Sequence, residues 1–205
     1  MITHDNIGIM TNNMQDPRLH TPVSELVFGV LPFFHSVGFM FGITGLVKRN
    51  TTVVVQRFEE DLFLKSIEKY KITNITIVPP IMNFLAKSPK VAKYDLTNLK
   101  EIICGAAPLS SKLEKAVRER LSYVKMIRQG YGLTEATQAV IFMCYGESRI
   151  GSSGKIVPGM TAKIFDTETK NNLGPGQVGE LCFKGRMVTK GYYGNIEATK
   201  TCFTD

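Results

Sequence analysis

The chain has 205 residues, of which 43% are hydrophobic and 21% are charged, values that suit an ordinary globular protein. Its four cysteines have no CxxC spacing and it has only three histidines, so neither a disulfide framework nor a zinc site is expected. The net charge of +7 is spread along the chain, much of it on expected solvated helix faces, which disfavours a nucleic-acid partner, although a basic surface would also suit an anionic small molecule. No apolar run reaches the roughly 20 residues of a membrane span.

Short β-branched runs alternate with helical patterns in the first part of the chain. Residues 51–55 predict a buried strand. Residues 58–71 predict a helix that is acidic at its start and basic at its end, as the helix dipole favours. Phe63, Ile67 and Tyr70 recur at helical spacing and are expected to form its apolar face.

The same alternation continues as far as residue 138. A helix is expected to begin with a capping box formed by Ser111 and Glu114, and its apolar stripe includes Val117 and Leu121. The other expected elements are strands over 74–78, 100–104 and 124–128, with a short helix over 81–87. Strands and helices that alternate at this spacing predict an α/β fold with a doubly wound, mostly parallel sheet over residues 1–138.

From residue 139 the pattern changes to strands joined by turns, with no helix before about residue 196. The expected strands cover 139–144, 161–166 and 178–184. Residues 139–205 are therefore predicted to form a β-rich subdomain of the same domain.

Two junctions that follow predicted strands carry candidate ligand-binding residues. Gly105, Ala106, Ala107 and Pro108 come before a helix, where ligands bind in open α/β sheets, although a tight turn alone explains these four residues. The second junction is expected to be a glycine-rich loop, Gln129-Gly130-Tyr131-Gly132-Leu133-Thr134-Glu135. Its threonine hydroxyl suits a phosphate oxygen and its carboxylate suits Mg²⁺, while a glycine-kinked loop without a ligand explains the residues equally well.

His35 lies in an apolar stretch over residues 31–38, where a lone histidine is usually a packing residue. The nearby aromatic residues are expected to belong to the core, or else to form the wall of an apolar pocket: Phe28, Phe33, Phe34, Phe39 and Phe41.

Taken together and in order, these segments resemble the adenylate-forming superfamily of AMP-binding enzymes. Residues 129–135 resemble its nucleotide motif, residues 105–109 its adenine-side loop and residues 32–35 its acyl-pocket motif. Residues 179–185, followed by 190–193, are similar to its structural β motif. The likeness covers essentially the whole chain, and the nearest group is the insect luciferase-like and 4-coumarate-type acyl-CoA ligases.

The resemblance implies a reaction in two steps. A carboxylate attacks the α-phosphate of ATP to give an acyl-adenylate and pyrophosphate, and the thiol of CoA then displaces AMP to give a thioester. ATP, Mg²⁺ and CoA are therefore the expected cofactors, and a fatty or aromatic acid is the expected substrate.

The resemblance also implies roles for individual residues. Thr134 is expected to contact phosphate, Glu135 to bind Mg²⁺, and His35 to lie near the reacting carboxylate. The adenylate would be held by Gly105, Ala106, Ala107, Pro108, Gln129, Gly130, Tyr131, Gly132, Leu133 and Thr134. The acyl pocket would include His35, Ser36, Val37, Gly105 and Gly130.

Parts of the family pattern are absent from these 205 residues. A phosphate loop with its lysine is expected before Met1, and a ribose-binding aspartate and a C-terminal domain with a catalytic lysine are expected after Asp205. The chain is therefore expected to be a central fragment, incomplete at both ends, that turns over little or no substrate by itself. Relatives are often peroxisomal, which makes the peroxisome the expected compartment and the cytosol its alternative.

The motifs do not separate a ligase from a luciferase. Met10 stands where beetle luciferases carry an arginine, and Gln138 where they carry a serine, so the acyl-CoA ligase is preferred over luciferin 4-monooxygenase. A truncated module that binds a nucleotide or acyl group without catalysis is a further alternative. A dinucleotide oxidoreductase is disfavoured because no GxGxxG follows a strand.

Overall fold

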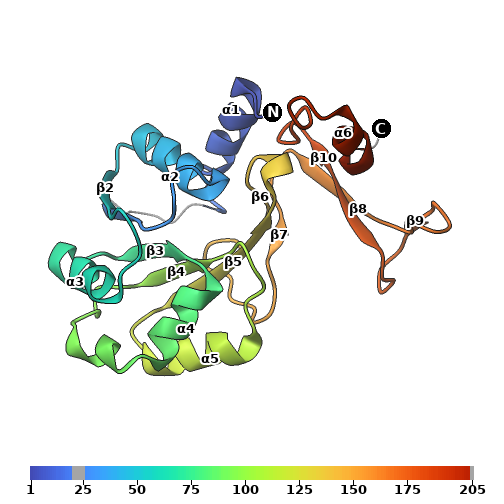
Figure 1. The fold of residues 1–205 in the computed structure, drawn as a ribbon. Coiled ribbons are helices and arrows are strands. Elements are labelled where there is room, and N and C mark those ends of the chain that lie inside the picture. Colours follow the sequence, from blue (N-terminus) through green and yellow to red (C-terminus); the bar gives the residue numbers. More distant parts are fainter. Residues whose placement is uncertain (20–25, 204–205) are drawn as a thin grey trace.

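The computed structural model describes residues 1–19 and 26–203, and the last two residues of the predicted β-rich subdomain lie outside this part (Figure 1). A seven-stranded sheet has the order β2-β1-β3-β4-β5-β6-β7. The first five strands in this order are parallel, and β6 and β7 are antiparallel. The strands are β1 (Leu26–Gly29), β2 (Thr51–Val54), β3 (Asn74–Ile77), β4 (Glu101–Cys104), β5 (Met126–Gly132), β6 (Ala139–Phe142) and β7 (Lys155–Ile156). The predicted α/β class with a mostly parallel sheet is confirmed.

Helices cover both faces of this sheet (Figure 1). One face carries α1 (His4–Asn13) and α2 (Ser36–Val47), and the other carries α3 (Glu60–Tyr70), α4 (Pro79–Lys87) and α5 (Ser111–Arg120). A short 3₁₀ turn, η1 (Pro89–Lys93), follows α4. From β1 the chain continues to β2 on one side of the sheet, whereas from β3 it continues to β4 and β5 on the other side. In open α/β sheets, ligands bind at the carboxyl ends of the strands where the strand order changes direction in this way.

The main hydrophobic core lies between the sheet and helices α3, α4 and α5. Phe63, Leu64 and Ile67 of α3 are fully buried there with Ile75 and Ile102 of the sheet. This confirms the expected apolar face of α3 except at its end, because Tyr70 is 41% exposed.

Three details of the predicted elements are wrong. β2 is not a buried strand, because it lies at the edge of the sheet with only β1 beside it, and its residues are exposed or half-buried. α4 begins at Pro79, since proline is well suited to the first turn of a helix. The cap of α5 is Ser110, whose hydroxyl accepts a hydrogen bond from the Leu113 N–H at 3.2 Å, so the expected capping box is not formed.

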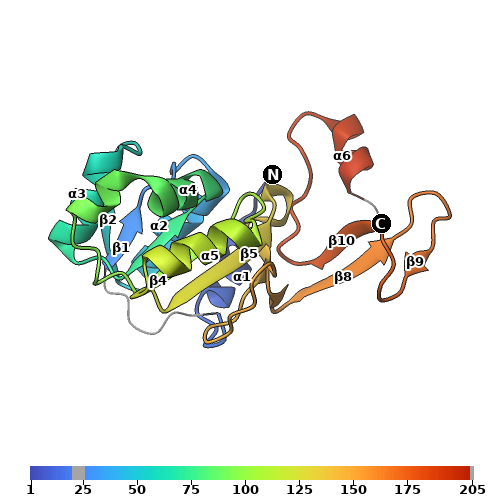
Figure 2. The same cartoon turned by 90° about the horizontal axis from the view of Figure 1, so that it is seen from below.

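The β-rich part contributes to two sheets. β6 and β7 continue the large sheet, and a second, three-stranded sheet has the order β10-β8-β9. Its strands are β8 (Met160–Phe165), β9 (Asn172–Leu173) and β10 (Glu180–Gly185), and α6 (Ile196–Cys202) follows them. Figure 2 shows this second sheet extending to one side of the first. None of the helices in the described ranges has the length and apolarity needed to cross a bilayer.

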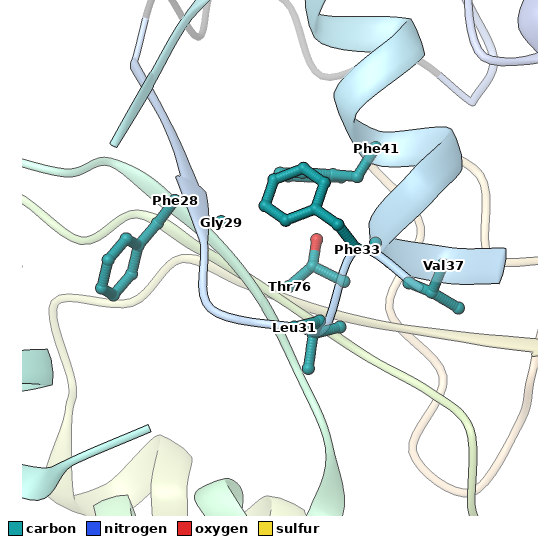
Figure 3. Close-up of a pocket in the computed structure, with 8 residues that line it drawn as sticks. Phe28, Gly29, Leu31, Phe33, Val37, Phe41 and Thr76 are labelled. Carbon is teal, nitrogen blue, oxygen red and sulfur yellow. The ribbon is translucent and has the colours of Figure 1, made fainter. Parts of the chain in front are cut away.

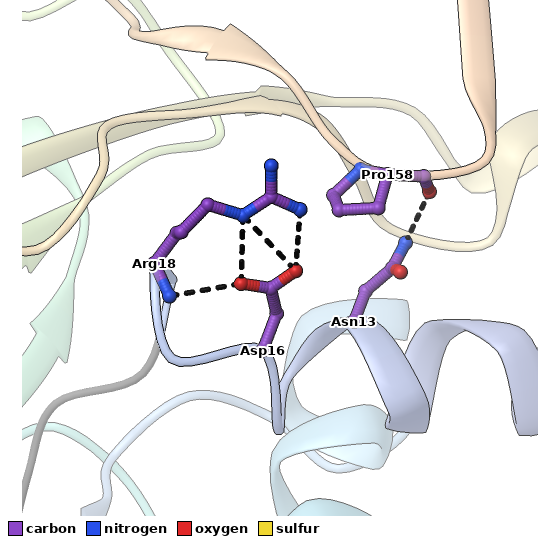
Figure 4. A network of polar contacts seen from close by, with 4 residues as sticks. All are labelled: Asn13, Asp16, Arg18 and Pro158. Carbon is purple, nitrogen blue, oxygen red and sulfur yellow. Dashed lines mark hydrogen bonds and ion pairs between the residues drawn. The ribbon is translucent and has the colours of Figure 1, made fainter.

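The N-terminal helix connects the two parts of the molecule. The Asn6 amide donates to the carbonyls of Arg186 (2.6 Å) and Val188 (3.2 Å). The Asn13 amide donates to the Pro158 carbonyl at 3.0 Å (Figure 4).

Just after this helix, the Arg18 guanidinium donates to both carboxylate oxygens of Asp16 (Figure 4). This hydrogen bonding lowers the pKa of Asp16 from 3.8 to about 2, so its carboxylate stays charged even at mildly acidic pH.

A buried ion pair lies in the sheet where β4 and β5 are neighbours. Arg128 is 1% exposed, and its Nε donates to the carboxylate of Glu101, which is 3% exposed. Its Nη1 donates to the carbonyls of Leu19 (3.0 Å) and Met143 (3.2 Å), and its guanidinium lies 5.1 Å from the centre of the Phe142 ring. One side chain therefore links β5 to β4, to the segment after α1 and to the end of β6.

Candidate active site at the carboxyl edge of the sheet

The predicted motifs gather at the carboxyl ends of neighbouring parallel strands. Residues 32–35 follow β1, residues 105–108 follow β4, and residues 129–132 form the last part of β5. Because β1, β3, β4 and β5 are parallel and adjacent, these segments share one edge of the sheet.

His35 caps a helix and is not a buried packing residue. It is exposed, and its Nδ1 accepts a hydrogen bond from the N–H of Val37 at 3.2 Å at the start of α2. Ser36 and Val37 in the first turn are half-buried. The imidazole is thus fixed through Nδ1 at the edge of the sheet, which leaves Nε2 for another partner.

An apolar cavity lies between β1, β3 and α2 (Figure 3). It is lined by Phe28, Gly29, Leu31, Phe33, Val37, Gly38, Phe41 and Thr76. Its volume of about 10 Å³ is close to that of one water-sized sphere, so an acyl group would enter only after the lining side chains moved.

The residues predicted for the acyl pocket are only partly brought together here. Val37 lines the cavity, whereas His35, Ser36, Gly105 and Gly130 are not among its lining residues. The expectation that the aromatic residues belong to the core holds for Phe28, and its alternative, the wall of an apolar pocket, holds for Phe33 and Phe41. Neither holds for Phe34, which is 94% exposed, or for Phe39.

The loop after β4 lies beside the glycine-rich end of β5. A Cβ on Gly105 would lie 3.1 Å from the Gly130 carbonyl oxygen, so the structure brings these two predicted nucleotide-binding segments together. Ala106 has a φ of 66°, a left-handed conformation that residues other than glycine rarely adopt. Ala107 and Pro108 are exposed beside it, and such strained backbone occurs often at ligand sites.

Residues 129–132 of the glycine-rich segment are the end of a strand, where the sequence predicted a loop over residues 129–135. β5 pairs with β4 as far as Gln129 and with β6 from Gly130 to Gly132, with an irregularity next to Tyr131. A Cβ on Gly130 would lie 2.6 Å from Phe142, and one on Gly132 would lie 2.1 Å from the backbone oxygen of Gln138. These glycines therefore allow β5 and β6 to approach closely.

Replacement of Gly132 by alanine is expected to lower the free energy of unfolding by about 1–3 kcal/mol, because the added Cβ overlaps backbone atoms that can yield only if the β5–β6 turn shifts. Urea unfolding of the full-length protein measures this. Gly8→Ala is the matched control, since a Cβ there meets nothing within 4 Å and alanine favours a helix. A Gly132→Ala variant as stable as the parent would contradict the expectation.

The side chain of Gln129 is turned away from solvent. It is buried, and its amide donates to Glu114 Oε2 of α5 at 3.0 Å. The other oxygen of Glu114 accepts from Arg118 at 2.8 Å. This network supports β5 from one face of the sheet, and the sequence pattern assigned no such role to Glu114.

Thr134 and Glu135 lie in a single 3₁₀ turn, η2 (Thr134–Ala136). Thr134 is exposed and Glu135 is half-buried. The Tyr192 hydroxyl donates to Glu135 Oε1 at 2.5 Å, and this hydrogen bond raises the pKa of Tyr192 well above its ordinary value, so the phenol remains a donor. Sequence reasoning placed Tyr192 in a structural motif over residues 190–193 and gave it no role in the site, because no pattern connects positions 57 residues apart.

The donor set around Glu135 fits Mg²⁺. No group of three or more histidine, cysteine, aspartate or glutamate side chains that could hold a metal occurs in the part of the chain that the structure describes. Mg²⁺ is commonly held by one or two carboxylates together with substrate phosphates and water, so a lone accessible carboxylate beside an exposed threonine suits it when a nucleotide is bound.

The family model described as "AMP-binding enzyme" matches residues 1–193. The chain belongs to this family. The resemblance inferred from the motifs is thereby confirmed, and AMP-binding enzymes of known sequence and structure are similar to the chain over nearly all of its length.

Relatives with two different activities are similar to this AMP-binding enzyme chain. The luciferin 4-monooxygenase of Nipponoluciola cruciata is 42% identical over 97% of this chain and 36% of its own length. The probable 4-coumarate–CoA ligase 3 of Dictyostelium discoideum is 43% identical over the same shares. The chain thus spans about a third of the length of these relatives.

Solved structures show the same fold. ATP-bound MatB from Rhodopseudomonas palustris matches 100% of this chain and 40% of its own, with a TM-score of 0.88 and 27% identity. A red-emitting luciferase from Phrixothrix hirtus matches 98% of this chain and 45% of its own, with a TM-score of 0.82 and 38% identity.

Proposed function

We propose that the full-length protein containing this chain activates a carboxylic acid with ATP and then transfers the acyl group to CoA. A carboxylate oxygen attacks the α-phosphorus of ATP, and the bond from that phosphorus to pyrophosphate breaks. The CoA sulfur then attacks the acyl carbon, its proton passes to solvent, and AMP leaves with the carboxyl oxygen. One observation carries the proposal: the loop after β4, the end of β5 and η2 lie together at the carboxyl ends of the parallel strands.

Within this proposal, backbone and small side chains hold the adenylate. The loop of Gly105, Ala106, Ala107 and Pro108 lies beside Gly130, and Tyr131, Gly132 and Leu133 continue the surface toward η2. Thr134 donates its hydroxyl to a phosphate oxygen, and Glu135 holds Mg²⁺. When bound, Mg²⁺ supplies positive charge that neutralises the phosphates. ATP-bound MatB, which has this fold, supports the choice of nucleotide.

His35, Ser36 and Val37 form the acyl side of the proposed site. His35 caps α2, Ser36 and Val37 form its first turn, and Val37 lines the apolar cavity together with the rings of Phe33 and Phe41 (Figure 3). Because these rings leave so little space, substrate entry requires that they rotate or that α2 shifts. An apolar or aromatic acid suits such a lining better than a charged one does.

A CoA ligase is preferred over a luciferase. Met10 of α1 has an uncharged side chain where beetle luciferases carry an arginine, and it is fully buried in the core beside β6. Gln138 adds a larger amide where those enzymes carry a serine, and its Oε1 is buried without a hydrogen-bond partner among the described residues. Luciferase activity remains the second candidate, since the identity to luciferin 4-monooxygenases is as high as that to the ligases.

Incubation of the full-length protein with ATP, Mg²⁺ and a panel of fatty and aromatic acids tests the proposal. We expect exchange of labelled pyrophosphate into ATP that depends on the acid, and acyl-CoA formation once CoA is added. Light emission with luciferin and oxygen in place of thioester formation would favour the luciferase. No exchange with any acid would overturn the enzymatic proposal and favour a binding module.

A further inference from the structure

Glu135, the proposed metal ligand, lies on an element that does little to fix it. The 3₁₀ turn η2 spans only Thr134–Ala136, and Leu133 at its start provides no side-chain cap. A glutamate in one short turn has free side-chain torsions, and ordering them costs free energy when a metal binds.

Tyr192 is itself held in place by α6 and the residue after it. Its backbone N–H donates to Thr199 Oγ1 at 2.9 Å, its ring meets the Phe203 ring edge-on at 5.8 Å, and its hydroxyl lies 3.6 Å from the Cys202 sulfur. The phenol that reaches Oε1 of Glu135 is therefore fixed by a part of the chain that is remote in sequence.

Two further hydrogen bonds attach the segment before Tyr192 to η2. The N–H of Thr189 donates to the backbone carbonyl of Glu135 at 2.7 Å, and the hydroxyl of the fully buried Thr137 donates to the Met187 carbonyl at 2.6 Å. Thr137 has a φ of 70°, an unfavourable backbone conformation for threonine, and its hydrogen bond to Met187 is formed in that conformation. Backbone and side chain of Glu135 are thus both held by residues 187–192.

We propose that Tyr192 is a positioning residue, which holds the Glu135 carboxylate through Oε1 and so presents Oε2 to the metal of the nucleotide complex. This inference rests on the proposed function. A hydrogen bond from outside the metal site that orients a ligand typically strengthens metal binding, because the ligand is ordered before the metal arrives. Tyr192 would not touch the nucleotide or the reacting atoms.

Tyr192→Phe in the full-length protein tests this, because it removes the hydroxyl and keeps the ring against Phe203. Binding of Mn²⁺, used in place of Mg²⁺, is measured by electron paramagnetic resonance with α,β-methylene-ATP, which does not react. We expect Mn²⁺ to bind about fivefold more weakly, the loss of one ordinary hydrogen bond. The Mg²⁺ concentration for half-maximal pyrophosphate exchange should rise by a similar factor. Tyr193→Phe is the matched control, because this neighbouring ring is 90% exposed.

The same fivefold change should vanish in a Glu135→Gln background if Tyr192 acts through Glu135. Unchanged or tighter Mn²⁺ binding by Tyr192→Phe, in a parent enzyme that performs the exchange, would overturn the positioning role and leave the proposed function intact. A parent protein with neither exchange nor nucleotide-dependent Mn²⁺ binding would overturn both.

Discussion

Replacement of Arg128 by methionine is expected to lower the free energy of unfolding by about 3–5 kcal/mol, because it removes the guanidinium that pairs with the buried carboxylate of Glu101. Methionine fills much of the same volume, so the loss comes from charge and hydrogen bonding. The carbonyls of Leu19 and Met143 also lose the donor that Arg128 provides. Urea unfolding of the full-length protein, monitored by circular dichroism, measures the change.

Two variants separate this effect from a general loss of charge. Lys155→Met breaks a surface pair in which lysine is 69% exposed, and it should cost less than about 1 kcal/mol. Arg128→Met combined with Glu101→Leu should recover part of the lost stability, since both members of the buried pair are then removed together. A single Arg128→Met variant as stable as Lys155→Met would show that the buried pair matters little.

Replacement of Glu135 by glutamine is expected to reduce the rate of adenylate formation by about 100-fold, with a higher Mg²⁺ requirement. The amide keeps the size of the side chain and removes the negative charge that suits Mg²⁺. Loss of one group that stabilises charge in a transition state typically has an effect of this size. Pyrophosphate exchange in the full-length protein at several Mg²⁺ concentrations checks both parts.

The matched control for this change is Glu119→Gln, an exposed glutamate of α5. It removes the same charge away from η2 and should leave the exchange rate and the Mg²⁺ requirement as they are. If Glu135→Gln kept the parent's Mg²⁺ dependence, Glu135 would not be the metal ligand.

Local patterns were sufficient to predict most of the large sheet. Period-two and period-3.6 hydrophobic repeats identify β3, β4, α3 and α5, because each of these elements buries one side on the same core. The pattern overestimated the burial of β2, since a β-branched run looks the same at the edge of a sheet as at its centre. Glycine spacing likewise does not distinguish a loop from a strand that lies close to its neighbour, as at Gly130 and Gly132.

The arrangement around the candidate site could be predicted only in part. Parallel strands bring the segments after β1 and β4 to the end of β5 at one edge, so the topology alone places His35, Gly105 and Gly130 there. The contacts of Gln129 with Glu114 and of Glu135 with Tyr192 depend on tertiary packing. Residues so far apart in a single sequence share no periodic pattern from which their contact could be predicted.

The attachment of α1 to the far end of the chain also has a consequence during synthesis. Asn6 bonds to the carbonyl of Arg186, 180 residues later, so α1 leaves the ribosome long before its docking site exists. At usual rates of translation the delay is roughly 10–40 s. During this time Met10, which is fully buried in the finished fold, is exposed on the nascent chain. The helix that joins the two sheets therefore stays without this contact until residue 186 has been synthesised.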